Sequence, residues 1–406
     1  MESTPLLFIG WDVGSIFRAA LLLLGILIPL VVIHELGHFV AARIFNIKVL
    51  EFGIGFPPRV RGASFQKGET EYTLNWLPLG GFVRLLGEED PSDPRSLAAA
   101  SAGKRLIVLY AGVAMNVVLA ILLLAVGFMI PRDRAMTMVE IVDVVPDSPA
   151  AEASVSGEML DGSEPEQGLQ PGDRVVEVEG RDIANPNELV YNARLSLGST
   201  QEWTVNRQGA LLDVEVYARF HPPPGEGSTG IQIAPPMTCA DVDAQGNPIN
   251  CELLYPYTES QWYWPWEAVP RGAQSLWETV VLTKNEIQVR VGGSSAGGAA
   301  GGNGEDAPVL TGPVGIADLT NQLVDQAGWR SLIEIAALLS LSLAVFNALP
   351  IPALDGGRAL FVFIEIFRGG KRISPEREGL VHLIGMALLF SAIIVITYLD
   401  IARIVT

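Results

Sequence analysis

The sequence predicts an α-helical polytopic membrane protein with four transmembrane helices, a membrane-associated β-hairpin or sheet, and an inserted extracytoplasmic α+β domain. Three observations lead to this fold class. Hydrophobic residues make up 49% of the 406 residues and charged residues 18%, against about 25% charged residues in an average soluble chain. Four segments are apolar enough to cross a bilayer, which takes about 20 residues. Most charged residues lie between these segments.

The overall charge and the cysteine count exclude several classes of protein. The formal net charge is −18, which argues against nucleic acid as a partner because phosphates need a basic surface. Two cysteines cannot build a disulfide-dense scaffold or a four-cysteine zinc site. The chain is therefore expected to be a membrane protein with an acidic soluble part.

The predicted spans cover residues 13–42, 106–130, 335–357 and 379–399. The first span carries ionisable residues near its end, whereas the second has no charge at all. A cleaved signal peptide is the alternative interpretation of the first span. It is disfavoured because no small-residue cleavage site follows and the helix continues into a charged motif.

The charges between the spans predict the orientation of the chain. Residues 43–105 hold nine Lys/Arg, and the short loop between the last two spans holds four. Residues 131–331 hold 11 Lys/Arg against 29 Asp/Glu. Because short basic loops stay in the cytoplasm, both termini and the long acidic segment should be extracytoplasmic. We expect a multi-pass protein of the cell inner (plasma) membrane.

Residues 136–220 have the pattern of a small α+β domain inserted between the second and third spans. Polar and apolar residues alternate as in β-strands, and one segment has helical spacing instead. These segments are 138–145, 174–179, 187–197, 202–206 and 212–218.

Residues 221–305 are predicted to be an extracytoplasmic aromatic region followed by a Gly-rich linker. The aromatic cluster at 261–266 is typical of a membrane surface, and 292–304 has linker composition. Cys239 and Cys251 enclose 11 residues on the predicted oxidising side. A disulfide bond between them is the prediction, and two free thiols are the alternative.

The first span contains the motif HELGH, in which two histidines share one face of a helix. His34 and His38 are four residues apart, so both can ligate one Zn²⁺. Glu35 lies one residue around the helix, where it can act as a base toward water. A polar patch at a helix end is the alternative. It is weak here, because an ionisable group deep in a bilayer costs about 2.5–3.5 kcal/mol.

A catalytic zinc needs a third protein ligand, and Asp355 is the best candidate. Spans one and three run in the same direction, so the histidine motif and Asp355 should lie at the same depth. Pro350 and Pro352 break the helix and let Asp355 turn inward. A simple helix-terminating turn at Asp-Gly-Gly is the alternative. His221 is on the wrong side of the membrane, and His382 belongs to another helix with no partner spacing.

Together these motifs resemble the site-2 protease family, specifically its bacterial regulator-of-sigma-E-protease branch. The likeness lies in HELGHF, in FNALPIPALDGG, and in the segments VVPDSPA and GLQPGDRVVEVEG, which make residues 136–220 similar to a PDZ domain. It covers most of residues 13–400. An acidic insert at 152–167 separates the two PDZ-like segments, and one PDZ-like domain stands where the branch often has two.

The resemblance implies an intramembrane zinc endopeptidase that cleaves transmembrane segments of single-span membrane proteins. Such regulated intramembrane proteolysis acts on anti-sigma factors or signal-peptide remnants. It implies Zn²⁺ held by His34, His38 and Asp355, with Glu35 as the base and Asn347 holding the substrate backbone or the oxyanion. A lipid bilayer and a peptide ligand of the PDZ-like domain are the other implied partners.

The resemblance is less complete on the second span, and it also suggests a role for the strand-like residues before that span. A family motif appears there as Gly-Val-Ala-Met-Asn, with Val113 in place of proline, so that only Asn116 is carried over. Residues 49–56 and 71–76 are strand-like, and in the family such a sheet dips into the membrane beside the active site. A cytoplasmic hairpin lying on the headgroups is the alternative.

Two other functions remain as alternatives at this point. The chain could be a non-catalytic membrane scaffold that recruits partners through the PDZ-like domain. It could instead be a zinc peptidase with a glutamate as third ligand, for which Glu365 is the candidate near enough to the third span. Metal content and cleavage of a spanning peptide separate the three functions.

Overall fold

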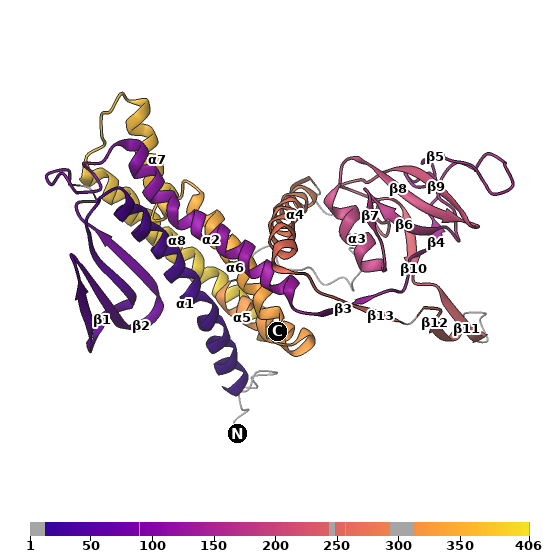
Figure 1. The fold of residues 1–406 in the computed structure, drawn as a ribbon, viewed down its shortest axis with the longest axis horizontal. Helices are drawn as coiled ribbons and strands as arrows, with labels where there is room; N and C mark the ends of the chain where they lie inside the picture. The colour runs from indigo at the N-terminus through magenta and orange to yellow at the C-terminus, as the bar shows by residue number, and fades with distance from the viewer. Residues whose placement is uncertain (1–12, 89, 243–247, 256, 293–311, 406) are drawn as a thin grey trace, which may run out of the picture. The chain divides into compact units, whose positions relative to one another are not determined.

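The computed structural model describes residues 13–405 except 89, 243–247, 256 and 293–311. The chain forms two compact units. We call Met1–Phe128, Pro265–Ala273 and Pro308–Thr406 the membrane unit, and Met129–Trp264 with Gln274–Ala307 the sheet unit. Figure 1 shows the helices of the first unit and the strands of the second.

Four helices of the membrane unit are long and apolar enough to cross a bilayer, which confirms the four predicted spans. A polytopic membrane protein follows. The helices are α1 (Val13–Ile44), α2 (Ala102–Met129), α6 (Ser331–Ala348) and α8 (Pro375–Val405). Helices α1 and α8 extend beyond the predicted bounds, and α2 and α6 each begin four residues earlier than predicted.

The third span is shorter than predicted. Helix α6 ends at Ala348 rather than continuing to residue 357, because Leu349 is extended and Pro350 and Pro352 cannot continue a helix. A separate helix, α7 (Asp355–Phe367), begins at the predicted metal ligand. Helix α5 (Pro313–Ala327) precedes α6 and was not predicted from the sequence.

The predicted β region between the first two spans is a long antiparallel hairpin of β1 (Val49–Lys67) and β2 (Thr70–Leu85). Strand β2 bends, so that Phe52 of β1 pairs with both Tyr72 and Val83. Residues at the base of the hairpin and on α1 and α2 share one buried apolar cluster that includes Ala42, Val49 and Val108. This cluster anchors the hairpin beside α1.

The sheet unit contains an antiparallel sheet in the order β10-β4-β6-β8-β9-β5, with β7 paired to β6. Its strands alternate buried and exposed residues, and the buried face surrounds Trp203 together with α3 (Pro186–Leu195). Strand β10 extends this domain beyond residue 220, the end predicted from the sequence. The strands are β4 (Glu140–Val144), β5 (Ser154–Ser156), β6 (Arg174–Val178), β7 (Arg181–Asp182), β8 (Thr200–Arg207), β9 (Ala210–Tyr217) and β10 (Ile231–Ala234).

Two short strand pairs and a long helix follow this sheet. Strands β11 (Met237–Val242) and β12 (Pro248–Leu253) place Cys239 opposite Cys251, whose side chains lie outside the described part of the structure. Strand β13 (Thr258–Gln261) pairs with β3 (Arg132–Ala135). Helix α4 (Pro265–Gly292) occupies a stretch assigned from sequence to an aromatic region and linker. Most of the predicted linker, from residue 293, lies outside the described residues.

Candidate metal centre

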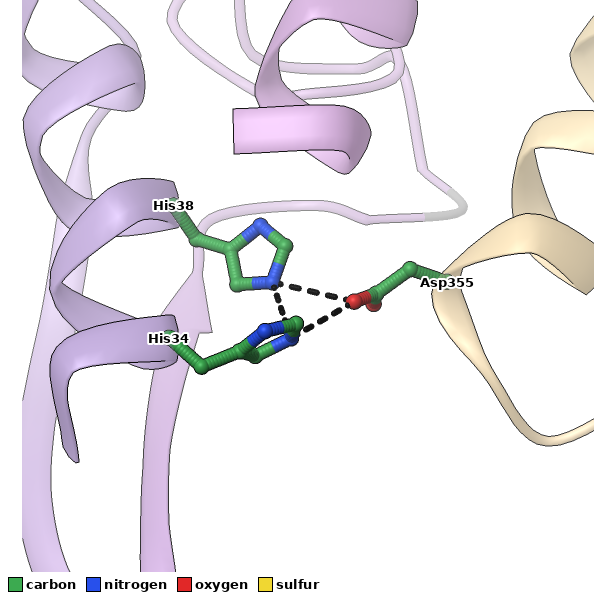
Figure 2. Close-up of side chains that lie close together, drawn as sticks. All are labelled: His34, His38 and Asp355. Carbon is green, nitrogen blue, oxygen red and sulfur yellow. Dashed lines mark hydrogen bonds and ion pairs between the residues drawn. The ribbon is translucent and has the colours of Figure 1, made fainter. Parts of the chain in front are cut away.

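Three predicted ligands meet in the membrane unit. Asp355 Oδ2 lies 2.9 Å from Nε2 of His34 and 3.1 Å from Nε2 of His38, and the two Nε2 atoms are 3.2 Å apart. Figure 2 shows both imidazoles pointing from α1 toward the Asp355 carboxylate. Both histidines are buried. The helix spacing and the broken third span therefore bring together the three residues that the sequence singled out.

The ring hydrogen bonds suit a cation at the centre of this cluster. Nδ1 of His38 lies 2.8 Å from the carbonyl oxygen of Val108, which can only accept, so Nδ1 carries the proton and the Nε2 lone pair points at Asp355. In His34, Nδ1 is 3.2 Å from Nδ2 of Asn116, whose Oδ1 is buried without a hydrogen-bond partner in the described structure. With this amide rotated, Oδ1 would accept from the Nδ1–H of His34 and leave Nε2 free for the ion. Two imidazole nitrogens and a carboxylate oxygen that converge on one point are a typical zinc donor set.

The size of the triangle also fits zinc. Ligand atoms about 2.0–2.1 Å from a tetrahedral ion lie about 3.3 Å from one another. The three separations here are 2.9, 3.1 and 3.2 Å. Three protein ligands leave the fourth position for water or substrate, which is the arrangement of catalytic rather than structural zinc sites.

Glycines on α1 and α2 make the room for this cluster. A Cβ on Gly112 would lie 2.5 Å from Nε2 of His38 and 2.7 Å from Nε2 of His34. A Cβ on Gly37 would lie 2.4 Å from the carbonyl oxygen of Ala111. Small residues let membrane helices approach closely, and here they let the imidazoles sit against the α2 backbone. Gly112 belongs to the Gly-Val-Ala-Met-Asn motif, but the motif by itself does not indicate this contact.

Asp355 is presented by a tight turn between α6 and α7. Pro350 and Pro352 end the preceding helix, and the chain folds so closely that a Cβ on Gly356 would lie 2.1 Å from the carbonyl oxygen of Leu349. A Cβ on Gly357 would lie 2.3 Å from the carbonyl oxygen of Ile351. The two glycines after Asp355 are therefore required by close packing of the turn against the start of α7.

The predicted base contacts the hairpin. Oε2 of Glu35 accepts a hydrogen bond of 2.9 Å from the backbone N–H of Val83. This bond orients the carboxylate next to the two histidines on the same helix. Nothing in the sequence pointed to Val83, because a backbone donor carries no side-chain signal.

Three other residues considered from sequence lie in different surroundings. The amide of Asn347 is buried near the end of α6, where it donates to the carbonyl oxygen of Leu343 at 2.9 Å. Glu365 forms ion pairs with Arg105 at 2.6 Å and Arg372 at 3.1 Å, so its carboxylate is engaged away from the histidines. His382 accepts a hydrogen bond from the turn before Asp355. The glutamate-ligand alternative thus lacks structural support.

Comparisons with known proteins find relatives among the zinc metalloproteases. A family model described as peptidase family M50 matches residues 20–392. The zinc metalloprotease RasP of Oceanobacillus iheyensis is 27% identical over 95% of this chain and 98% of its own length. RasP of Geobacillus kaustophilus is 27% identical over 92% and 95% of the two chains. A putative zinc metalloprotease of Clostridium perfringens is 32% identical over 92% and 95%. The chain belongs to peptidase family M50, the site-2 proteases, in the regulator-of-sigma-E-protease-like branch, and is a zinc metalloprotease.

Proposed function

We propose that His34, His38 and Asp355 hold the catalytic zinc, and that the enzyme cleaves peptide bonds within the membrane-spanning segments of single-span proteins. One observation carries this proposal. His34 contacts Asn116, which lies at the middle of the 28-residue apolar helix α2. At about 1.5 Å per residue, Asn116 is roughly 20 Å from either end of that helix. This depth along α2 supports a membrane-embedded peptide bond as the substrate.

The reaction divides between the metal and the side chains around it. Bound zinc would supply a Lewis acid that polarises the scissile carbonyl. Glu35 takes a proton from the attacking water and delivers it to the leaving amine. The N–H of Val83 fixes the direction of the Glu35 carboxylate before substrate enters. Asn347 can donate to the developing oxyanion once its amide leaves the Leu343 carbonyl.

The hairpin offers a place for the substrate backbone. A transmembrane helix hides its peptide bonds in its own hydrogen bonds, so it must unwind before hydrolysis. The 81–85 part of β2 directs the Val83 N–H to Glu35 rather than to β1, so this edge faces the base. An unwound substrate segment that adds to this edge as a strand would place its backbone beside the metal centre.

The sheet unit is proposed to face the extracytoplasmic side of the inner membrane as a PDZ-like domain that binds a peptide. The short loops around the spans are basic and residues 131–331 are acidic, which supports this orientation. The strand and helix order of the sheet unit supports the domain type. Membrane-anchored anti-sigma factors and signal-peptide remnants are the proposed substrates. A purely non-catalytic scaffold is disfavoured by the assembled donor set.

The test uses the full chain reconstituted in liposomes with a tagged single-span peptide and a soluble peptide of the same scissile sequence. We expect cleavage of the spanning peptide only, and loss of cleavage in Glu35→Gln. Glu69→Gln is the matched control, because Glu69 pairs with Arg95 on the exposed hairpin surface. Cleavage of the soluble peptide at an equal rate would contradict intramembrane proteolysis. Unchanged cleavage by Glu35→Gln would contradict the proposed base, and a wild-type protein that cuts neither peptide would contradict the proposed substrate class.

A further inference from the structure

The turn that presents Asp355 contains a residue in an unfavourable backbone conformation. Ala353 has φ of +81°, in the left-handed region that favours glycine. Residues with a Cβ stay in this region only when their surroundings hold them there. Because Ala353 is two residues before Asp355, its backbone angles set the direction of the Asp355 side chain.

Helix α8 supplies the group that holds this residue. The backbone N–H of Ala353 donates a hydrogen bond of 2.9 Å to Nδ1 of His382. The His382 ring also packs on Phe361 of α7, with 5.4 Å between ring centroids. One helical turn farther on α8, a Cβ on Gly385 would lie 2.3 Å from Cβ of Pro352. Two neighbouring residues of α8 therefore contact the turn directly, one through a hydrogen bond and one through close approach.

Apart from these contacts, little of α8 is buried in the protein. In the most apolar stretch of α8 only 6% is buried inside the protein, against 22%, 28% and 33% in the corresponding stretches of the other three candidate spans. The turn and α8 also border an apolar hollow of about 380 Å³, so little else supports Pro352 on that side. A polar restraint on the Ala353 backbone matters most where packing contributes least.

We propose that His382 is a positioning residue, which holds Ala353 in its left-handed conformation and thereby aims Asp355 at His34 and His38. This inference rests on the proposed assignment of Asp355 as a zinc ligand. His382 acts through the backbone and not as a ligand itself, because its Nδ1 accepts the Ala353 N–H. Groups that orient a metal ligand from behind commonly change metal affinity by about 10–100-fold when removed.

The test measures zinc affinity of the full-length protein in detergent by competition with a chelator. His382→Phe keeps a ring against Phe361 but has no acceptor, so we expect zinc to bind roughly 10–100-fold more weakly. His382→Asn loses the ring but places Oδ1 near the position of Nδ1, so zinc affinity should stay close to wild type. His382→Leu is a second acceptor-free variant. Leu383→Ala is the control, because Leu383 is exposed on the next position of α8.

A rescue variant connects the effect to Ala353. Glycine adopts φ of +81° without steric cost, so Ala353→Gly in the His382→Phe background should restore part of the lost affinity. The thermal stability of each zinc-free variant is measured in parallel, so that a weaker affinity in a folded His382→Phe protein separates aiming from folding. Wild-type affinity in both acceptor-free variants, or equal losses in Asn and Phe, would overturn the proposal. Retained zinc in Asp355→Ala would instead show that the ligand assignment itself fails.

Discussion

Asp355 Oδ2 lies 2.9 Å from Nε2 of His34, although 321 residues separate them in the chain. His34 belongs to the membrane helix α1 and Asp355 begins the separate helix α7, and the sheet unit is inserted between them in sequence. Bound zinc would therefore connect α1 to the start of α7. Because zinc binds the folded site and not separated helices, metal binding should raise the thermal stability of the membrane unit.

The histidines should be required for metal binding and Glu35 for turnover only. We expect one zinc per wild-type chain, and loss of zinc in His34→Ala or His38→Ala. Glu35→Gln should keep the metal and lose activity, because Glu35 acts on the proton of water and not on the ion. Elemental analysis and a peptide-cleavage assay measure these outcomes. Full metal occupancy in the His38→Ala protein would refute its assignment as a ligand.

Asp355 should be required for metal binding, whereas Asn347 should be required for turnover only. Asp355→Ala should lower zinc affinity sharply, since it removes one of three protein ligands. Asn347→Ala should keep zinc and lose roughly 10²–10³ in rate if Asn347 donates to the oxyanion. Chelator competition and single-turnover cleavage distinguish binding from rate. The assignment of Asn347 is wrong if its alanine variant cleaves at the wild-type rate.

The sheet unit should control access and leave the chemistry to the membrane unit. Thr258 of β13 pairs directly with Ala135 of β3, so residues 136–257 can be replaced by an Asn-Gly turn that joins the two strands. This cut also removes β10, which a deletion ending at residue 220 would leave without its partner strand β4. We expect the shortened protein to cleave a pre-trimmed substrate as before, or an untrimmed one faster. A folded, zinc-loaded variant that cuts neither would show that the domain delivers substrate.

Cys239 and Cys251 should form a disulfide bond. The register of β11 and β12 places their backbones directly opposite each other, as a bridge requires. The bond would close a short loop and contribute about 3 kcal/mol at most. Alkylation of denatured, non-reduced protein followed by mass spectrometry measures the thiol content. Labelling of both cysteines before reduction would show free thiols.

The stability of the sheet unit should depend on Glu188 at low pH. Burial alone would raise the pKa of this carboxyl, but hydrogen bonds from Arg134 and from the Ala184 backbone lower the pKa below its usual value. The carboxylate accepts both Arg134 bonds at 2.6 Å, while Glu188 N–H donates to the N-cap Asn185. Because the pKa of Glu188 is lower in the folded protein, its ionised carboxylate stabilises the fold at pH values above the unfolded-state pKa of about 4.3. This stabilisation is lost as the pH falls through the folded-state pKa.

Glu188→Gln is the variant that measures this effect. At pH 7 we expect it to unfold at a lower temperature than wild type, because glutamine cannot replace the charged pair with Arg134. As the pH falls below the unfolded-state pKa of about 4.3 and through the lower folded-state pKa, the wild-type carboxylate takes up a proton, so the two melting temperatures should converge. Thermal unfolding of the full chain in detergent between pH 7 and pH 3 provides the comparison. A difference that stays constant over this range would contradict the lowered pKa.

Some of this protein can be predicted from sequence because the relevant physics is local. Apolar length identifies a span, and i, i+4 spacing puts His34 and His38 on one helix face whatever surrounds them. Proline ends α6 before Asp355 because its ring fixes φ and removes the backbone N–H that a helix needs. The meeting of Asp355 with the histidines also follows, because spans one and three run in the same direction and bring these residues to the same depth in the membrane. The zinc donor set could therefore be predicted before any contact was known.

The tertiary structure decided everything that depends on which backbone approaches which side chain. The sequence does not indicate that Val83 donates to Glu35, that Val108 fixes the His38 proton, or that His382 meets Ala353. Helix α4 was not predicted either, because its many polar side chains obscure a helical pattern. Strand β10 was not predicted because it joins the sheet by pairing with β4. These contacts join residues far apart in the chain. No local pattern encodes them, because their energy comes from partners that only folding brings together.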